Sequence, residues 1–215
     1  MFVMEKAPKS IDAEAYRSLR SNIEYSSFDD EHRVIVVTSS VPEEGKSTTS
    51  GNLAIALAQS GNSVLLVDCD MRKPSIHKNF KISNAAGTAE LLLRKKLFEE
   101  VANKYNENLT IITAGKIPPN PSEMLASRAM TAFIEEMKKE FKYIILDTPP
   151  LQAVTDAQVL STKADGVLLV VRAGSTKREM VFNSVDLIKK VHGKVIGTVL
   201  NGVENKKNSY YYYGE

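Results

Sequence analysis

The chain has 215 residues, and its 28 lysines and arginines against 26 aspartates and glutamates leave a net charge of +2, too small to attract nucleic acid in general. The longest apolar runs have five to six residues, whereas a membrane-spanning helix needs about 18, so any membrane association is expected to be peripheral. A single cysteine, Cys69, excludes an internal disulfide and, with no apolar leader at the N-terminus, favours a reducing cytoplasm.

In chain order, the first predicted element is a helix over residues 12–25, and strands and helices alternate after it. Glu14, Arg17 and Arg20 are spaced three apart and therefore share one face of that helix. Taken alone, such charges are typical of a solvated helix face with weak ion pairs. Further helices are predicted at residues 46–60, 122–141 and 176–192, and Gly61 and Gly193 follow the first and last of these.

Six short apolar runs predict strands. They occupy residues 34–37, 64–67, 109–112, 143–146, 167–171 and 195–200. The runs are continuous rather than alternating, which is the pattern of parallel strands covered on both faces. We therefore expect one α/β domain over residues 1–203, with a doubly wound, mostly parallel sheet and helices on both of its faces.

A candidate phosphate-binding loop lies between the first predicted strand and the helix that follows it. The predicted nucleotide-binding residues are Glu43, Glu44, Gly45, Lys46, Ser47, Thr48 and Thr49. Strand, glycine-lysine-serine loop and helix are the context of a P-loop, in which backbone amides and the lysine bind the phosphates of ATP and the serine hydroxyl binds Mg²⁺. Ser40 replaces the first glycine of the general G-x-x-x-x-G-K-[ST] pattern, and a helix start without a ligand is the alternative.

Aspartates end two other predicted strands. Asp68 and Asp70 follow residues 64–67, and Asp147 follows residues 143–146. Ligands of such sheets collect at the carboxyl ends of the strands, so these carboxylates are expected near the metal and the triphosphate. Strand-ending aspartates can instead cap the following turn, and the basic pair Arg72 and Lys73 either meets phosphate, holds a neighbouring subunit or is a solvated turn.

The end of the chain carries a polar segment at residues 204–209 and then Tyr210, Tyr211, Tyr212 and Tyr213. We expect residues 204–215 to form a flexible tail in which these side chains are not all buried. A tyrosine hydroxyl titrates near 10, so its attack on a γ-phosphoryl group requires a carboxylate to accept the proton, and Asp70 is the candidate base. The alternative is an aromatic patch that binds a partner surface.

Three segments together resemble the bacterial tyrosine kinases. They are Leu66-Val67-Asp68-Cys69-Asp70-Met71-Arg72-Lys73-Pro74, the triplet Thr38-Ser39-Ser40 before the P-loop, and Leu146-Asp147-Thr148-Pro149-Pro150. The resemblance spans nearly the whole chain and is closest to the catalytic protein of the two-protein type. It implies an ATP- and Mg²⁺-dependent tyrosine kinase that acts in capsular or exopolysaccharide synthesis.

The resemblance also assigns roles to residues. It makes Gly45 to Thr48 Walker A, Asp68 and Asp70 Walker A′, and Asp147 Walker B. The catalytic residues it implies are Lys46, Asp68, Asp70 and Asp147, and the metal ligands are Ser47, Asp70 and Asp147. Glu43 departs from the glycine that many relatives have in this loop, so its side chain must point away from the phosphates and nucleotide affinity could be lower.

Partners and location follow from the same resemblance. Glu14, Arg17 and Arg20 match an E-x-x-R-x-x-R motif for subunit contact and imply a ring-shaped homo-oligomer. The tyrosines at 210–213 would be phosphorylated by a neighbouring subunit. A transmembrane activator and polysaccharide co-polymerase would hold the protein at the inner face of the membrane, and a cognate tyrosine phosphatase would reverse the reaction.

Two other functions remain open. One is a switch ATPase of the partition or cell-division type, but such proteins carry a signature lysine five positions before the P-loop lysine, and that position is Val41. The other is a nucleotide-gated scaffold without turnover, which four intact candidate catalytic residues make less favourable. His32, His77 and His192 are scattered without acidic or cysteine partners at ligand spacing, and no zinc site is expected.

Overall fold

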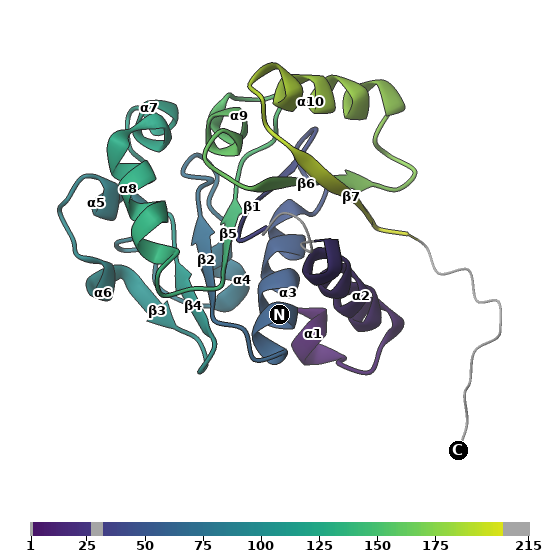
Figure 1. The fold of residues 1–215 in the computed structure, drawn as a ribbon, viewed down its shortest axis with the longest axis horizontal. Coiled ribbons are helices and arrows are strands. Elements are labelled where there is room, and N and C mark those ends of the chain that lie inside the picture. Colours follow the sequence, from purple (N-terminus) through teal and green to yellow (C-terminus); the bar gives the residue numbers. More distant parts are fainter. Residues whose placement is uncertain (1, 27–31, 204–215) are drawn as a thin grey trace.

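A computed structural model describes residues 2–26 and 32–203. Its centre is a seven-stranded sheet in the order β3-β4-β2-β5-β1-β6-β7 (Figure 1). The strands are β1 (Val34–Ser39), β2 (Val64–Asp68), β3 (Ala102–Lys104), β4 (Leu109–Ile112), β5 (Tyr143–Asp147), β6 (Gly166–Arg172) and β7 (Val195–Asn201). All neighbouring pairs are parallel except β3 and β4.

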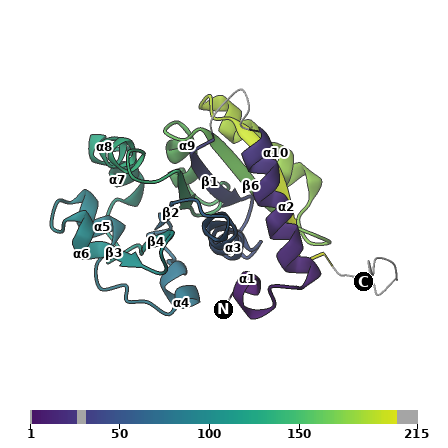
Figure 2. The same cartoon turned by 60° about the horizontal axis from the view of Figure 1, so that its bottom comes forward.

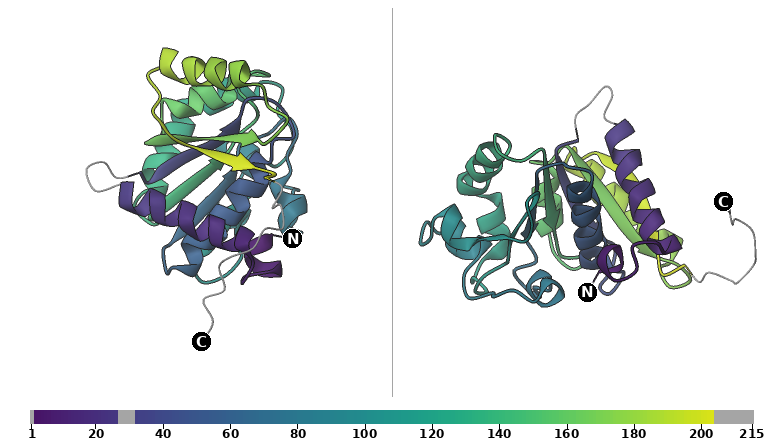
Figure 3. Two further views of the ribbon diagram at one scale, coloured as in Figure 1. Left: turned by 90° about the vertical axis from the view of Figure 1, so that its right-hand side faces the viewer. Right: turned by 90° about the horizontal axis from the view of Figure 1, so that it is seen from below.

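Helices cover both faces of this sheet (Figures 1 and 2). On one face lie α3 (Lys46–Gln59), α1 (Val3–Lys6), α4 (Ile76–Phe80) and α2 (Ile11–Ser26), which packs against α3 (Figure 3). On the other lie α5 (Thr88–Leu92), α6 (Phe98–Val101), α7 (Pro121–Ala126), α8 (Arg128–Met137), α9 (Asp156–Ser161) and α10 (Arg178–Lys190). No helix within the described residues is long and apolar enough to cross a membrane.

The two cores explain why the strand sequences are continuously apolar. Val34 and Val36 of β1 point into the core on the α8 side, whereas Ile35 and Val37 point into the core on the α3 side. Because both faces are covered, both sets of alternating side chains must be apolar. The prediction of a doubly wound α/β fold is therefore confirmed.

One predicted helix was wrong, and one strand was missed. The helix expected at residues 122–141 is two helices, because Ser127 has an extended backbone and its hydroxyl accepts the Met130 N–H at 3.3 Å, which starts a new helix. Strand β3 was not predicted, since it is a three-residue antiparallel edge strand without an apolar run. The helix expected at residues 12–25 is present as α2, and the six predicted strands are all present within one or two residues.

The register of the sheet brings three strand ends together. Asp68, the last residue of β2, is the cross-strand partner of Asp147, the last residue of β5, and Val37 of β1 pairs with Asp147 on its other side. The carboxyl end of β1 leads into the loop before α3. The candidate phosphate loop and the strand-ending aspartates therefore lie at one edge of the sheet, where ligands of such folds bind.

Candidate active site

The backbone of the loop between β1 and α3 depends on its one glycine. Gly45, immediately before α3, has φ of 94°, a left-handed conformation that glycine adopts readily. A Cβ at this position would lie 1.9 Å from Nδ2 of Asn201 at the end of β7. Gly45 is therefore required both by its conformation and by the close approach of β7.

Glu44 supports this loop from within the protein. Its side chain is buried, its Oε2 accepts the Val41 N–H at 3.0 Å, and its Oε1 accepts the Thr176 hydroxyl. Its backbone oxygen accepts Nδ2 of Asn201 at 2.9 Å. Thr176 and Asn201 were missed from the sequence, although polar residues after apolar strands were the signal that identified the aspartates.

Glu43 adopts a strained backbone. Its φ is 68°, in the left-handed region that costs a non-glycine residue roughly 1–2 kcal/mol. Its carbonyl oxygen accepts Nη1 of Arg172 at 3.0 Å, which holds this conformation in place. Position 43 therefore has a backbone conformation that favours glycine, and the glutamate there is exposed.

We expect Glu43→Gly to raise the free energy of unfolding by about 1 kcal/mol, because glycine adopts this φ without strain. Nucleotide affinity should be equal or higher, as measured by titration with a fluorescent ATP analogue beside thermal unfolding. Gly61→Ala is the matched control: φ there is 86° and a Cβ would meet nothing within 4 Å, so it should lose stability with unchanged nucleotide affinity. A less stable Glu43→Gly protein would contradict the strain argument.

Lys46 and Asp70 form the central ion pair of the site. Nζ of Lys46 lies 2.9 Å from Oδ2 of Asp70, and the two side chains are only 13% and 4% exposed. Burial alone would lower the pKa of Lys46, but the carboxylates of Asp147 and Asp70 outweigh it and raise the pKa above its ordinary value. The lysine therefore stays protonated and available to a phosphate.

Asp68 and Asp70 do not make equivalent contacts, because β2 ends at Asp68 and the chain turns. Oδ2 of Asp68 accepts the N–H groups of Ser75 and Ile76 at 3.3 and 3.1 Å, at the start of α4. These are the capping contacts of the alternative interpretation. The catalytic role of Asp68 stays a prediction, whereas Asp70 contacts the P-loop lysine directly.

Asp147 is fully buried and keeps one oxygen unpartnered. Ser50 donates its hydroxyl to Oδ1 at 2.9 Å, but Oδ2 has no hydrogen-bond partner among the described residues. Burial raises the pKa of Asp147, and nearby Lys46 only partly opposes this. A buried carboxylate oxygen without a partner is costly unless a ligand meets it.

The oxygen donors of the site suit Mg²⁺, which binds few protein ligands, better than a metal that is held by protein ligands alone. The described part of the chain contains no cluster of three histidine, cysteine, aspartate or glutamate side chains that could hold an ion. Mg²⁺ takes one or two protein oxygens together with phosphates and water, and the Ser47 hydroxyl and Asp147 are hard donors of that kind.

The site opens into a pocket of about 630 Å³, a volume typical of small-molecule sites. Its lining residues are Pro42, Glu43, Gly45, Lys46, Ser47, Thr48, Asp70, Arg72, Lys73, Pro74, Ser75, Lys78, Asn79, Pro149, Pro150, Ala153, Val154, Arg172 and Asn201. The buried side chains of Glu44 and Thr49 do not line it. Any contact of Glu44 with phosphate would therefore come from its backbone.

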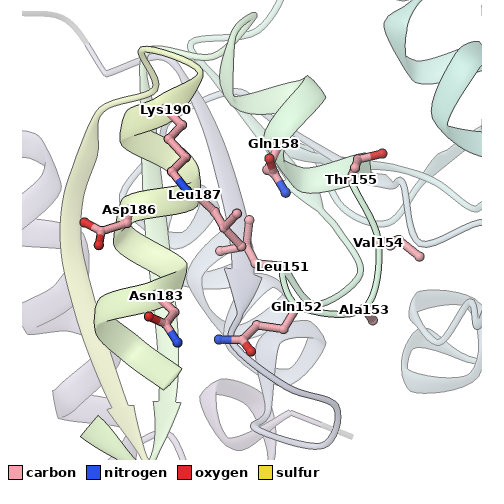
Figure 4. A pocket seen from close by; sticks show the side chains of 10 residues that line it. All are labelled: Leu151, Gln152, Ala153, Val154, Thr155, Gln158, Asn183, Asp186, Leu187 and Lys190. Atoms are coloured by element: carbon pink, nitrogen blue, oxygen red, sulfur yellow. The ribbon is translucent and has the colours of Figure 1, made fainter. Parts of the chain in front are cut away.

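A second pocket of about 490 Å³ lies between α9, α10 and residues 151–155. Figure 4 shows Leu187 and Lys190 of α10 on one side of it and Gln158 and Thr155 on the other. Ala153 and Val154 line both pockets, so one short segment separates them.

Cys69 lies between Asp68 and Asp70 in the chain and is fully buried, in the core on the α8 side of the sheet. Burial and the neighbouring charges of Asp68 and Asp147 raise the pKa of its thiol well above the ordinary value. We expect the native protein not to react with a thiol-specific colorimetric reagent, because the thiolate is the reactive form. The unfolded chain should react with one equivalent of the reagent per chain. Rapid reaction of the native protein would show that the region around Cys69 opens.

Glu14, Arg17 and Arg20 do not line this pocket. On α2, Arg17 pairs with Glu14 at 2.9 Å and Arg20 with Glu24 at 3.5 Å, both within the same helix. Their role in subunit contact stays a prediction. The tyrosines at 210–213 lie outside the described residues.

Comparison with known proteins identifies the family of the chain. A protein-family model described as AAA domain matches residues 32–198. Tyrosine-protein kinase YwqD of Bacillus subtilis is 42% identical over 96% of this chain and 88% of its own length, and tyrosine-protein kinase CpsD of Streptococcus agalactiae is 35% identical over 94% and 88%. The chain belongs to the bacterial tyrosine kinase family. It resembles the two-protein type, since it spans 88% of the length of each of these two relatives.

Solved structures of the family superpose closely. The kinase domain of Escherichia coli tyrosine kinase ETK matches with a TM-score of 0.92 at 32% identity, covering all of this chain and 85% of that one. The chimerical protein CapA2B2 matches with a TM-score of 0.89 at 38% identity, covering 93% and 88%. A plasmid partition protein of Borrelia burgdorferi, with a TM-score of 0.63 at 21% identity over 81% and 83%, shares the fold alone.

Proposed function

We propose that this tyrosine kinase transfers the γ-phosphoryl group of ATP to Tyr210–Tyr213 of a neighbouring copy and thereby regulates capsular or exopolysaccharide synthesis. The observation that carries the proposal is the pocket that the P-loop residue Lys46 and its partner Asp70 line, with the buried Asp147 nearby, whose Oδ2 has no hydrogen-bond partner among the described residues. The family supplies the reaction type, because the named relatives are tyrosine-protein kinases.

The residues of the pocket and of the neighbouring strand ends have different roles in phosphoryl transfer. Backbone N–H groups at the start of α3 bind the phosphates, and Lys46 leaves Asp70 to meet the β and γ phosphates. Mg²⁺, held by Ser47 and Asp147, would supply charge neutralisation. The tyrosine oxygen forms the new bond to phosphorus as the bond to the ADP oxygen breaks, and the tyrosine proton passes to the Asp70 carboxylate freed from Lys46.

The partners follow from the same family. A transmembrane activator would bind the kinase and hold it at the inner face of the membrane, and similarity to the chimerical protein CapA2B2 supports a second polypeptide as partner. Glu14, Arg17 and Arg20 would contact the next subunit of a ring, which a tethered tail could reach at high effective concentration. A cognate tyrosine phosphatase would remove the phosphate.

Labelled ATP with Mg²⁺ tests the proposal on the full chain, with and without the cytoplasmic peptide of a candidate activator. Label on residues 210–213, absent from a variant with all four tyrosines changed to phenylalanine, is the expected result. Free phosphate with bare tyrosines would support the switch ATPase instead. Nucleotide binding without turnover in the presence of the peptide would support the scaffold.

A further inference from the structure

Arg72 is held at the wall of the nucleotide pocket by a carboxylate that the reaction outlined above does not use. Asp156, the first residue of α9, is wholly buried, whereas the Arg72 side chain is 40% exposed and lines the pocket. Nε of Arg72 lies 3.1 Å from Oδ2 of Asp156, and Nη2 lies 3.3 Å from Oδ1. This is a two-point contact that fixes the plane of the guanidinium.

Ser122 completes the arrangement from α7. Its hydroxyl accepts Nη2 of Arg72 at 3.1 Å and itself donates to Oδ1 of Asp156. Two elements distant in sequence from Arg72, α7 and α9, thus converge on its side chain. Nη1 of Arg72 makes no hydrogen bond to any residue in the described ranges, so one edge of the guanidinium retains its donors.

Because Arg72 is close in the chain to the predicted base, its free Nη1 donors are available to a group bound in the active site. Arg72 is two residues from Asp70, and Oδ1 of Asp70 accepts the N–H of Lys73, so the segment after β2 is fixed to the predicted base. The pocket lined by Arg72 also contains Lys46 and the start of α3. A solvated basic turn would not require a fully buried carboxylate, since burying an ionised group is costly unless it is paired.

Building on the proposed kinase activity, we propose that Arg72 contacts the transferring phosphoryl group and that Asp156, with Ser122, is the positioning residue that aims it. The phosphoryl group develops charge on its equatorial oxygens during transfer, and a fixed guanidinium stabilises that charge. Asp156 acts only through Arg72. This dependence makes the two residues energetically coupled.

The test measures nucleotide affinity, tyrosine labelling rate and melting temperature for the full chain and four variants. Arg72→Ala should lower the labelling rate at saturating ATP by about a hundredfold, and Asp156→Asn by about tenfold because the guanidinium is no longer aimed. Affinity for ATP should change little in both. Arg72→Ala/Asp156→Asn should label as slowly as Arg72→Ala but melt at a higher temperature, because it no longer buries an unpaired charge.

Asp165→Asn is the control for a merely structural effect. Asp165 accepts the N–H groups of Arg33 and Val34 at 2.9 and 2.7 Å at the opposite end of the sheet, so its variant should melt earlier but label normally. Should Arg72→Ala not fold, the double variant supplies the rate. Normal labelling by either variant without Arg72, or a further loss when Asp156→Asn is added to Arg72→Ala, overturns the proposal. If the unmodified protein labels no tyrosine, the proposed function fails instead.

Discussion

Replacing Lys46 with methionine is expected to lower the rate of tyrosine labelling by about a hundred- to a thousandfold. Methionine keeps much of the length of the side chain but removes the charge that meets the phosphates. It also leaves Asp70, only 4% exposed, without its partner at 2.9 Å. Breaking a buried ion pair from one side costs about 3 kcal/mol, so the ligand-free variant should also be less stable.

Two measurements separate these effects. Labelling is followed at ATP concentrations that saturate each protein, and stability is followed by chemical unfolding without nucleotide. Lys139→Met is the matched control, because Lys139 is exposed and lies beside Phe141 and Lys142 at the other end of the sheet. A Lys46→Met protein that labels tyrosine at the normal rate would contradict the role of the P-loop lysine in phosphoryl transfer.

Asp147→Asn is expected to have opposite effects on stability and on activity. In the protein without ligands, the buried carboxylate has an unpartnered Oδ2 and a cross-strand neighbour, Asp68, whose pKa is also raised well above its ordinary value by burial and by Asp147. A neutral amide removes this repulsion and should stabilise the fold by about 1–3 kcal/mol at neutral pH. Phosphoryl transfer should fall by at least about a hundredfold, because an amide is a poor Mg²⁺ ligand.

The pH dependence of that stabilisation has a definite sign. The pKa of Asp147 is raised from 3.8 in the fold, so the folded protein binds more protons than the unfolded chain in the range above 3.8. Ligand-free protein should therefore lose stability as the pH rises from 3.8 through the raised pKa, and part of this loss should be absent from Asp147→Asn. The difference between the two unfolding free energies should grow with pH.

Mg²⁺ with nucleotide supplies the complementary measurement. It should stabilise the unmodified protein more than Asp147→Asn, since only the former offers a carboxylate to the metal. Ser50→Ala is a control that removes the hydrogen bond to Oδ1 but keeps the charge. An Asp147→Asn variant that is less stable than the parent at neutral pH without Mg²⁺ would contradict the electrostatic argument.

The sequence alone determined most of the strands of the sheet and the candidate chemistry at their carboxyl ends. Continuous apolar runs predicted strands buried on both faces, and the glycine-lysine-serine loop after the first run identified the phosphate site. Both signals are local: a run of apolar residues of strand length and a loop whose backbone must approach an anion are visible without knowledge of what packs on them. Asp68, Asp70 and Asp147 were found because they end such runs.

Only the tertiary structure decided how these residues divide their contacts. Asp68 caps the turn before α4 while Asp70 pairs with Lys46, although both stand in the same motif. The hydrogen bonds of Glu44 with Thr176 and Asn201, and the ion pair of Asp156 with Arg72, join residues more than 80 positions apart. Such pairings have no periodic or local signature, because they arise from the strand order of the sheet, which brings distant strand ends to one edge.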